Sequence, residues 1–152
     1  MIEVNDIILR LGAAALIGGA IGLNRDLHHK PSGLRTLALV ALGAALAVVT
    51  ATEAGTGPNP ASPAIQGVLA GVGFLGAGVI VLDQSSQKVR GLTTAAAIWL
   101  TACLGCACGL GLWPPALVAT ALVALVLVLG GRIEKAVHRK IEGDGDGAQG
   151  DG

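Results

Sequence analysis

Glycines between residues 71 and 76 carry the spacing of a dinucleotide-binding loop. The letters GVGFLG match GxGxxG, but such a loop needs a preceding strand, a helix start that is open to water and an acidic residue about 20 positions further on. In this chain the flanking residues are apolar, and the region near residue 96 reads Ala-Ala-Ala-Ile-Trp. We therefore interpret the glycines as a helix-packing surface and exclude a nucleotide site.

A second candidate site is the cysteine cluster of residues 103–108, which contains a CxxC and a CxC spacing. A zinc site needs about four donors. No histidine is close in sequence, because the three histidines occupy positions 28, 29 and 138 and are expected on the opposite membrane face. We therefore interpret Cys103, Cys106 and Cys108 as small residues that pack between helices, and we expect no metal site and no cofactor.

Carboxylates are absent from the middle of the apolar stretches, since Asp6, Glu53 and Asp83 lie at their ends. Magnesium prefers oxygen ligands and gives up its water reluctantly. A pathway for it would need these end carboxylates or backbone carbonyls presented by a broken helix, which local unwinding at Gly76–Gly78 would provide. No nucleophile with a neighbouring base is apparent, so we expect no enzyme.

Arg10 lies one helical turn after Asp6, inside the first apolar stretch. Near the outer membrane boundary the two side chains can form an i,i+4 pair, and the arginine can reach up to water. Deeper in the membrane the same arginine would be a candidate functional residue. The sequence leaves both interpretations open.

Basic residues also mark the junction of the first two apolar stretches. Arg25 and Asp26 close the first stretch, and Arg35 and Thr36 open the second. An arginine in the first turn of a helix is unusual, because the positive end of the helix dipole disfavours it. We expect Arg35 either to pair with Asp26 or Asp83, or to anchor to lipid phosphate.

The fourth apolar stretch begins after Gly91 with Thr93 and Thr94. A threonine hydroxyl can cap the first turn of a helix or bond across to a neighbouring helix, and we expect the cap. Trp99 lies deeper than an interfacial aromatic residue normally does, which predicts packing against glycine surfaces. Trp113 fits the outer aromatic belt.

The composition identifies the elements that must position these residues. The chain has 152 residues, of which 53% are hydrophobic, 13% charged and 2% aromatic, whereas soluble domains carry about 25% charged residues. Ten basic and ten acidic residues leave no net charge and no basic field for nucleic acid. We predict one all-α membrane domain, residues 1–141, with five helices long enough to span a bilayer. The predicted spans are residues 6–23, 34–52, 65–82, 92–112 and 114–131.

The ends of the chain are polar. Residues 132–141 alternate apolar and basic residues, which fits either a short helix at the membrane surface or a frayed end of the fifth helix. Residues 142–152 are rich in Gly and Asp and are predicted to be disordered. The acidic N-terminus and the long first apolar stretch argue against a cleaved signal peptide.

The distribution of Lys and Arg predicts the orientation in the membrane. With the N-terminus outside, nine of the ten basic residues fall on one side, and only Arg10 is left over. The connector after the second span and the turn after the fourth carry none. The positive-inside rule makes the basic side cytoplasmic, so we expect the N-terminus outside and the C-terminus inside.

Two glycine pairs at i,i+4 spacing, Gly18/Gly22 and Gly67/Gly71, are typical of close helix contacts in membranes. The contacts lie either within one chain or between chains, and we expect packing within the chain first.

Several sequence blocks together resemble the MgtC/SapB family of bacterial inner-membrane proteins, over about residues 9–131. The blocks are Arg10-Leu11 with residues 18–25, then residues 33–36, residues 71–78 (GVGFLGAG) and residues 91–99 (GLTTAAAIW). The residues that we single out as family-motif and candidate functional residues are Arg10, Arg25, Arg35, Thr36, Gly71, Gly73, Phe74, Gly76, Gly78, Gly91, Thr93, Thr94 and Trp99.

The resemblance implies a membrane domain linked to growth at low magnesium and, in pathogens, to survival inside host cells. Members are often called magnesium transporters, and several look like regulators of other membrane proteins. This chain has Asn24 where many members are acidic, Leu37 where many have another residue, and Asn59-Pro60 without the family's charged Asp-Pro-x-Arg pattern. An external charged contact is therefore not carried over. Some members carry a soluble C-terminal domain, and from the short Gly/Asp tail we expect none in this chain.

We therefore expect a non-enzymatic, multi-pass inner-membrane protein associated with magnesium homeostasis or with stress and virulence adaptation. It would act in the lipid bilayer through helix contacts with a membrane-protein partner or with itself. The alternative is a transporter or channel for magnesium or another cation, with a polar cavity lined by the carbonyls of Gly71–Gly78 and by Thr93 or Thr94. A third hypothesis is a purely structural oligomer.

Overall fold

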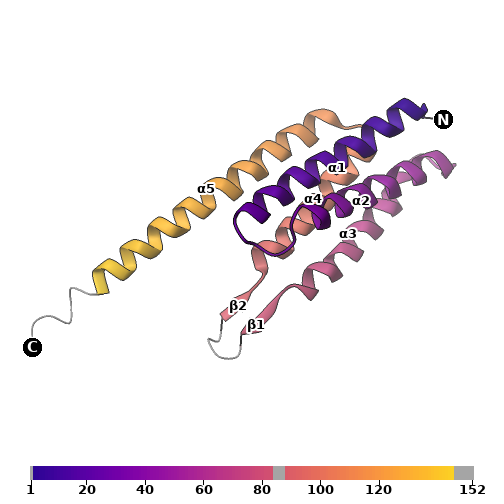
Figure 1. The fold of residues 1–152 in the computed structure, drawn as a ribbon. Helices are drawn as coiled ribbons and strands as arrows, with labels where there is room; N and C mark the ends of the chain where they lie inside the picture. Colours follow the sequence, from indigo (N-terminus) through magenta and orange to yellow (C-terminus); the bar gives the residue numbers. More distant parts are fainter. Residues whose placement is uncertain (1, 84–87, 146–152) are drawn as a thin grey trace, which may run out of the picture. The chain divides into compact units, whose positions relative to one another are not determined.

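The computed structural model describes the backbone of residues 2–83 and 88–145 and the side-chain surroundings of residues 2–81 and 89–130. The elements in chain order are α1 (Val4–Leu27), α2 (Leu34–Ala54), α3 (Ala61–Gly78), β1 (Val81–Asp83), β2 (Lys88–Arg90), α4 (Leu92–Gly109) and α5 (Trp113–Gly145) (Figure 1). Within these described ranges, five helices are long and apolar enough to cross a membrane. The predicted membrane architecture of five helices is confirmed.

The third helix differs from its predicted bounds. α3 ends at Gly78 rather than at residue 82, and the chain continues into a small antiparallel hairpin of β1 and β2. The β-branched residues 79–81 favour extended backbone at this point. Gly91 then turns the chain from β2 into α4 with a φ of 92°, a conformation that only glycine adopts readily.

α5 is also longer than the predicted span of residues 114–131, because it continues to Gly145 as one helix. Residues 132–141 are therefore a continuation of the fifth helix and not a separate surface helix. Residues 142–145 are helical, although the sequence predicts disorder for them, and residues 146–152 lie outside the described residues.

The chain divides into two compact units after residue 117. The first unit, Met1–Leu117, holds α1–α4, the hairpin and the first turn of α5. The second unit, Val118–Gly152, holds the remainder of α5. The polar contacts and grooves described below lie in the first unit.

α2 is the central helix of the first unit, where it contacts α1, α3 and α4 (Figure 1). Glycines make two of these contacts very close. A Cβ atom added at Gly18 or Gly22 of α1, or at Gly105 or Gly109 of α4, would overlap backbone atoms of α2. The predicted role of the Gly18/Gly22 pair in packing within the chain is confirmed.

Small side chains fill the spaces between these helices. One buried cluster joins Ala14 of α1, Ala41 and Ala45 of α2, Cys108 of α4 and Ala116 of α5. A second cluster extends toward α3 and contains Ala44, Val48, Ala61, Ala102 and Cys106. Two of the three cysteines are thus packing residues, as predicted, and the third, Cys103, is partly buried.

Hydrogen bonds between helix ends fix the directions of the helices. Arg25 near the end of α1 bonds to Thr94 at the start of α4. At the opposite end, the Ile2 N–H donates to the Glu53 carboxylate near the end of α2. α1 therefore runs antiparallel to α2 and α4, and the hairpin shares one end of the unit with the connector between α1 and α2 (Figure 1).

Replacement of Gly105 by Ala is expected to destabilise the bundle, because the added Cβ would overlap the backbone of Ala41. Overpacking of this kind costs about 1–3 kcal/mol. The matched control is Gly12→Ala in α1, where no atom lies within 4 Å of the added Cβ, so alanine's higher helix propensity leaves stability equal or slightly raised. Thermal unfolding in detergent measures both variants, and equal Tm values would contradict the close contact of α4 with α2.

Candidate functional site

Arg25 is a charged side chain that is only 2% exposed. Its Nη2 donates to the Thr94 hydroxyl at 2.7 Å and to the Pro31 carbonyl at 2.8 Å, and its Nε donates to the carbonyls of Pro31 and Ser32 at 3.2 Å. These acceptors are all neutral, so hydrogen bonds hold the guanidinium where an ion pair would be more usual. Arg25 thereby ties the α1–α2 connector, residues 28–33, to the first turn of α4.

The α1–α2 connector contains two non-glycine residues in the left-handed region. His29 has a φ of 51° and Ser32 a φ of 61°, and such residues persist only where their surroundings hold them. The bond from the Arg25 guanidinium holds the Ser32 carbonyl. The Asp26 carboxylate accepts the Leu34 N–H at 2.9 Å, which satisfies an otherwise unpaired donor at the start of α2.

Thr94 does not cap its own helix. The N-cap residue of α4 is Gly91, and no side chain caps it, so the predicted threonine cap is wrong. A capping hydroxyl must come from the residue before the first helical position, whereas Leu92 already lies within the helix. Thr94 is buried and makes the cross-helix bond to Arg25, and Thr93 is exposed.

Arg10 makes a second polar contact at the other end of the unit. Its Nη2 pairs with the Asp6 carboxylate at 2.7 Å, as in the first of the two interpretations that the sequence leaves open. Its Nη1 donates to the Gly109 carbonyl at 2.9 Å, and its Nε is buried without a partner among the described residues. Gly109 is the last residue of α4, where carbonyls carry partial negative charge, so Arg10 also binds the end of that helix.

Arg35 and Thr36, in the first turn of α2, are both exposed. Arg35 makes no ion pair with a side chain that the structure describes. Asp26, one of its predicted partners, instead binds the Leu34 N–H. The side chain of the other predicted partner, Asp83, lies outside the described residues.

The glycines of α3 have more open surroundings than those of α1 and α4. Four of them would place an added Cβ where no atom lies within 4 Å, and these are Gly67, Gly71, Gly73 and Gly78. Gly76 is the exception, because an added Cβ would contact the Ala95 Cβ at 3.5 Å. Phe74 is 82% exposed. α3 therefore leaves most of its surface without a neighbour in the first unit.

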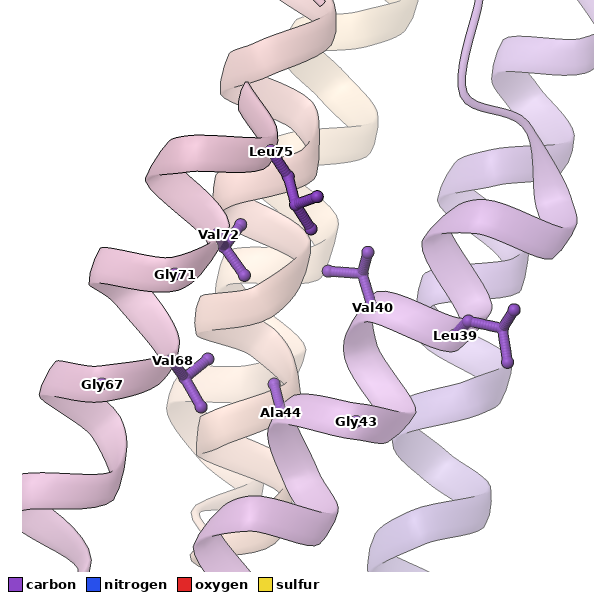
Figure 2. Close-up of a pocket in the computed structure, with 9 residues that line it drawn as sticks. All are labelled: Leu39, Val40, Gly43, Ala44, Gly67, Val68, Gly71, Val72 and Leu75. Carbon is purple, nitrogen blue, oxygen red and sulfur yellow. The ribbon is translucent and has the colours of Figure 1, made fainter. Parts of the chain in front are cut away.

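An apolar groove of about 380 Å³ lies between α2 and α3 (Figure 2). Val40 and Gly43 line it on α2, and Gly67, Gly71 and Leu75 line it on α3. Figure 2 shows the Val40 and Leu75 side chains facing each other across the groove. The missing side chains at the glycine positions keep it open.

The end of α3 is not unwound. The helix is continuous to Gly78, and the Gly76 and Ala77 carbonyls accept the N–H groups of Val79 and Ile80 at 3.2 Å. The hypothesis that Gly76–Gly78 unwinds locally is therefore wrong.

The two tryptophans have different surroundings. Trp99 is 44% exposed, so the predicted packing against glycine surfaces does not enclose it. Trp113 packs against the buried cluster that contains Ala14 and Cys108.

Sequence reasoning missed the partners that Arg10 and Arg25 of α1 find on α4. Arg25 and Thr94 are 69 positions apart, and Arg10 and Gly109 are 99 apart, so no local pattern joins them. One signal was available for Arg25, because no acidic residue lies three or four positions from it. An arginine without a partner on its own helix must find acceptors elsewhere.

Comparison with known proteins gives a family match over most of the chain. Residues 11–136 match the model described as the MgtC family. Protein SrpB of Synechococcus elongatus is 46% identical over 129 residues, which cover 78% of this chain and 71% of SrpB. Protein MgtC of Brucella abortus is 44% identical over 119 residues, with 78% of this chain and 49% of that protein covered.

Protein MgtC of Salmonella typhimurium is 42% identical over 122 residues, which cover 80% of this chain and 51% of that protein. The chain thus spans about half the length of these MgtC proteins. No solved structure matches the chain.

Thr94→Val is expected to destabilise the bundle by about 1–3 kcal/mol, because buried Arg25 loses a hydroxyl acceptor for its Nη2. The matched control is Thr93→Val, the same change at the exposed neighbouring position, which should stay within about 0.5 kcal/mol of the parent. Denaturant unfolding in micelles measures the difference. Equal losses in the two variants would show that the Arg25–Thr94 bond adds nothing to stability.

Proposed function

The chain belongs to the MgtC family, and from this we propose that it is a multi-pass protein of the bacterial inner membrane that serves magnesium homeostasis or adaptation to stress and virulence. We propose that it is not an enzyme and that it acts through helix contacts with membrane-protein partners or with further copies of itself. The relatives named MgtC support the family link, and the five apolar helices support the membrane location.

The open face of α3 is the observation that carries this proposal. The glycines of α1 and α4 that face α2 are in close contact with its backbone. In contrast, a Cβ added at Gly67 or Gly71 would have no atom within 4 Å. At a membrane helix surface, glycine lets another helix approach at backbone distance. Toward lipid it offers few atoms for dispersion contacts. α3 is therefore suited to contact another helix.

We propose that the N-terminus lies outside the cell and the C-terminus inside. Lys30 of the α1–α2 connector and Arg90 of β2 belong to segments at the same end of the first unit (Figure 1). The positive-inside rule favours the cytoplasm for that end. Arg10, at the opposite end, is paired with Asp6, which lowers the cost of a basic residue on the outer side.

Cation transport is the alternative function. It would require a polar cavity lined by the carbonyls of residues 71–78 and by Thr93 or Thr94. Among the described residues, these carbonyls belong to a continuous helix, Thr94 is bonded to Arg25, and the groove beside α3 is apolar. These observations support helix contacts over transport.

Fusions of alkaline phosphatase, which is active only outside the cytoplasm, test the proposed orientation. A fusion after Gly57, between α2 and α3, is expected to be active, and a fusion after Lys30 is expected to be inactive. Cytoplasmic green fluorescent protein at the same two positions should give the reverse result. Activity after Lys30 with none after Gly57 would invert the topology.

Gly71→Leu is expected to abolish support of bacterial growth at low magnesium without unfolding the chain. An added side chain at this position meets no atom within 4 Å of its Cβ in the protein itself, but it would block the approach of another helix. The matched control is Gly12→Leu, which is equally open but lies on α1, and it should support growth normally. Growth rate and retained helix content by circular dichroism are measured for both variants.

Magnesium uptake by liposomes containing the purified protein distinguishes the two functions. The proposal expects the same uptake as in empty liposomes. Uptake well above that level, together with its loss in Gly76→Leu, would overturn the contact proposal in favour of transport.

A further inference from the structure

The α1–α2 connector presents exposed basic side chains at a membrane boundary. It joins two helices that are both candidate membrane spans, so it must lie where lipid headgroups are. Lys30 in the connector and Arg35 in the first turn of α2 are exposed, and so are His28 and His29. The segment therefore displays positive charge at the depth of the phosphate layer.

This charge is not neutralised by the side chains that the structure describes. Lys30 and Arg35 make no ion pair with any of them. Asp26 is the acidic residue of the segment, and one of its oxygens is bound to the Leu34 N–H. Arg25, Lys30 and Arg35 together outweigh that single carboxylate, so the connector attracts anions.

An apolar groove begins directly beside this basic segment. It runs between α1 and α2 and has a volume of about 380 Å³. Leu34, which directly follows the connector, and Leu23, in the last part of α1, line the groove near the connector. Leu16 and Gly19 line it further along α1. A basic cluster and an apolar groove thus adjoin at the membrane surface. This combination fits a ligand with an anionic head and a hydrocarbon tail.

The connector is also held in place before any ligand binds. Arg25 bonds the carbonyls of Pro31 and Ser32 and the hydroxyl of Thr94. The loop that carries Lys30 therefore needs little further ordering. A preorganised site binds more tightly, because less conformational entropy is lost on binding.

We propose that Lys30 and Arg35 bind the phosphate of an anionic phospholipid and that one acyl chain of the same lipid lies in the α1–α2 groove. Lysine and arginine both bind phosphate oxygens, and the leucine and alanine walls of the groove match a hydrocarbon chain. The site goes beyond the proposed function, since it requires neither a protein partner nor a particular orientation of the chain.

Native mass spectrometry of the full chain, titrated with phosphatidylglycerol or phosphatidylethanolamine in detergent, tests the site. The parent protein is expected to retain phosphatidylglycerol preferentially. K30Q/R35Q should weaken that binding about thirtyfold, equivalent to about 1 kcal/mol for each basic residue. Gly19→Leu should also weaken it by filling the groove, because an added Cβ there is in ordinary contact distance of Ala38 and does not disturb the helices.

Two controls make the result specific. R139Q/K140Q removes the same number of charges from α5 and should leave phosphatidylglycerol affinity unchanged, and Gly12→Leu is the control for the groove variant. Soluble glycerol phosphate should not displace the lipid at equal concentration.

Three results would overturn the proposal. The first is equal loss of affinity in K30Q/R35Q and R139Q/K140Q, which would indicate unspecific charge attraction. The second is unchanged affinity in K30Q/R35Q with intact helix content. The third is displacement by glycerol phosphate, which would mean that the site binds free phosphate and not a lipid.

Discussion

Glycines of α1 and of α4 let both helices pack directly against the backbone of α2. The other contacts of the first unit depend on this close packing. Lipid supplies no hydrophobic force between helices, so their association rests on close packing and on interhelical hydrogen bonds. Only 2% of the residues are aromatic, and a wider spacing would leave gaps that alanine and cysteine could not fill. The same closeness lets the two arginines of α1 reach α4.

These arginines attach the two ends of α1 to the two ends of α4, in electrically different ways. Arg10 meets the last carbonyls of α4, where the helix dipole favours a cation. Arg25 meets the first turn of α4, where the dipole opposes a cation. Its bonds to the Thr94 hydroxyl and to two connector carbonyls offset that disadvantage. The buried guanidinium thus shapes the connector while it joins two helices.

Local features of the molecule could be predicted from the sequence, and features that depend on distant neighbours could not. The five helices follow from apolar length, and the Arg10–Asp6 pair follows from i,i+4 spacing. The pairs Gly18/Gly22 and Gly67/Gly71 have the same spacing but different surroundings, since one contacts α2 and the other is open.

The i,i+4 spacing of two glycines shows that another helix can approach that face closely. It does not show which helix lies there. The same limit explains why the sequence predicts that Thr94 caps its own helix, whereas the hydroxyl accepts a hydrogen bond from Arg25. The acceptor that Arg25 needs comes from a part of the chain that no local pattern connects to it.

The hydrogen bonds of Arg25 also bear on how the chain is made. Its bonds to Pro31 and Ser32 join α1 to the α1–α2 connector, whereas Thr94 is synthesised 69 positions later than Arg25. At about 5–20 residues per second, that interval lasts roughly 3–14 s. During this time the Arg25 guanidinium can already bind the Pro31 and Ser32 carbonyls of the α1–α2 connector. The first two helices can therefore leave the insertion machinery with part of the Arg25 guanidinium already hydrogen-bonded. α4, which supplies the Thr94 hydroxyl, is synthesised later.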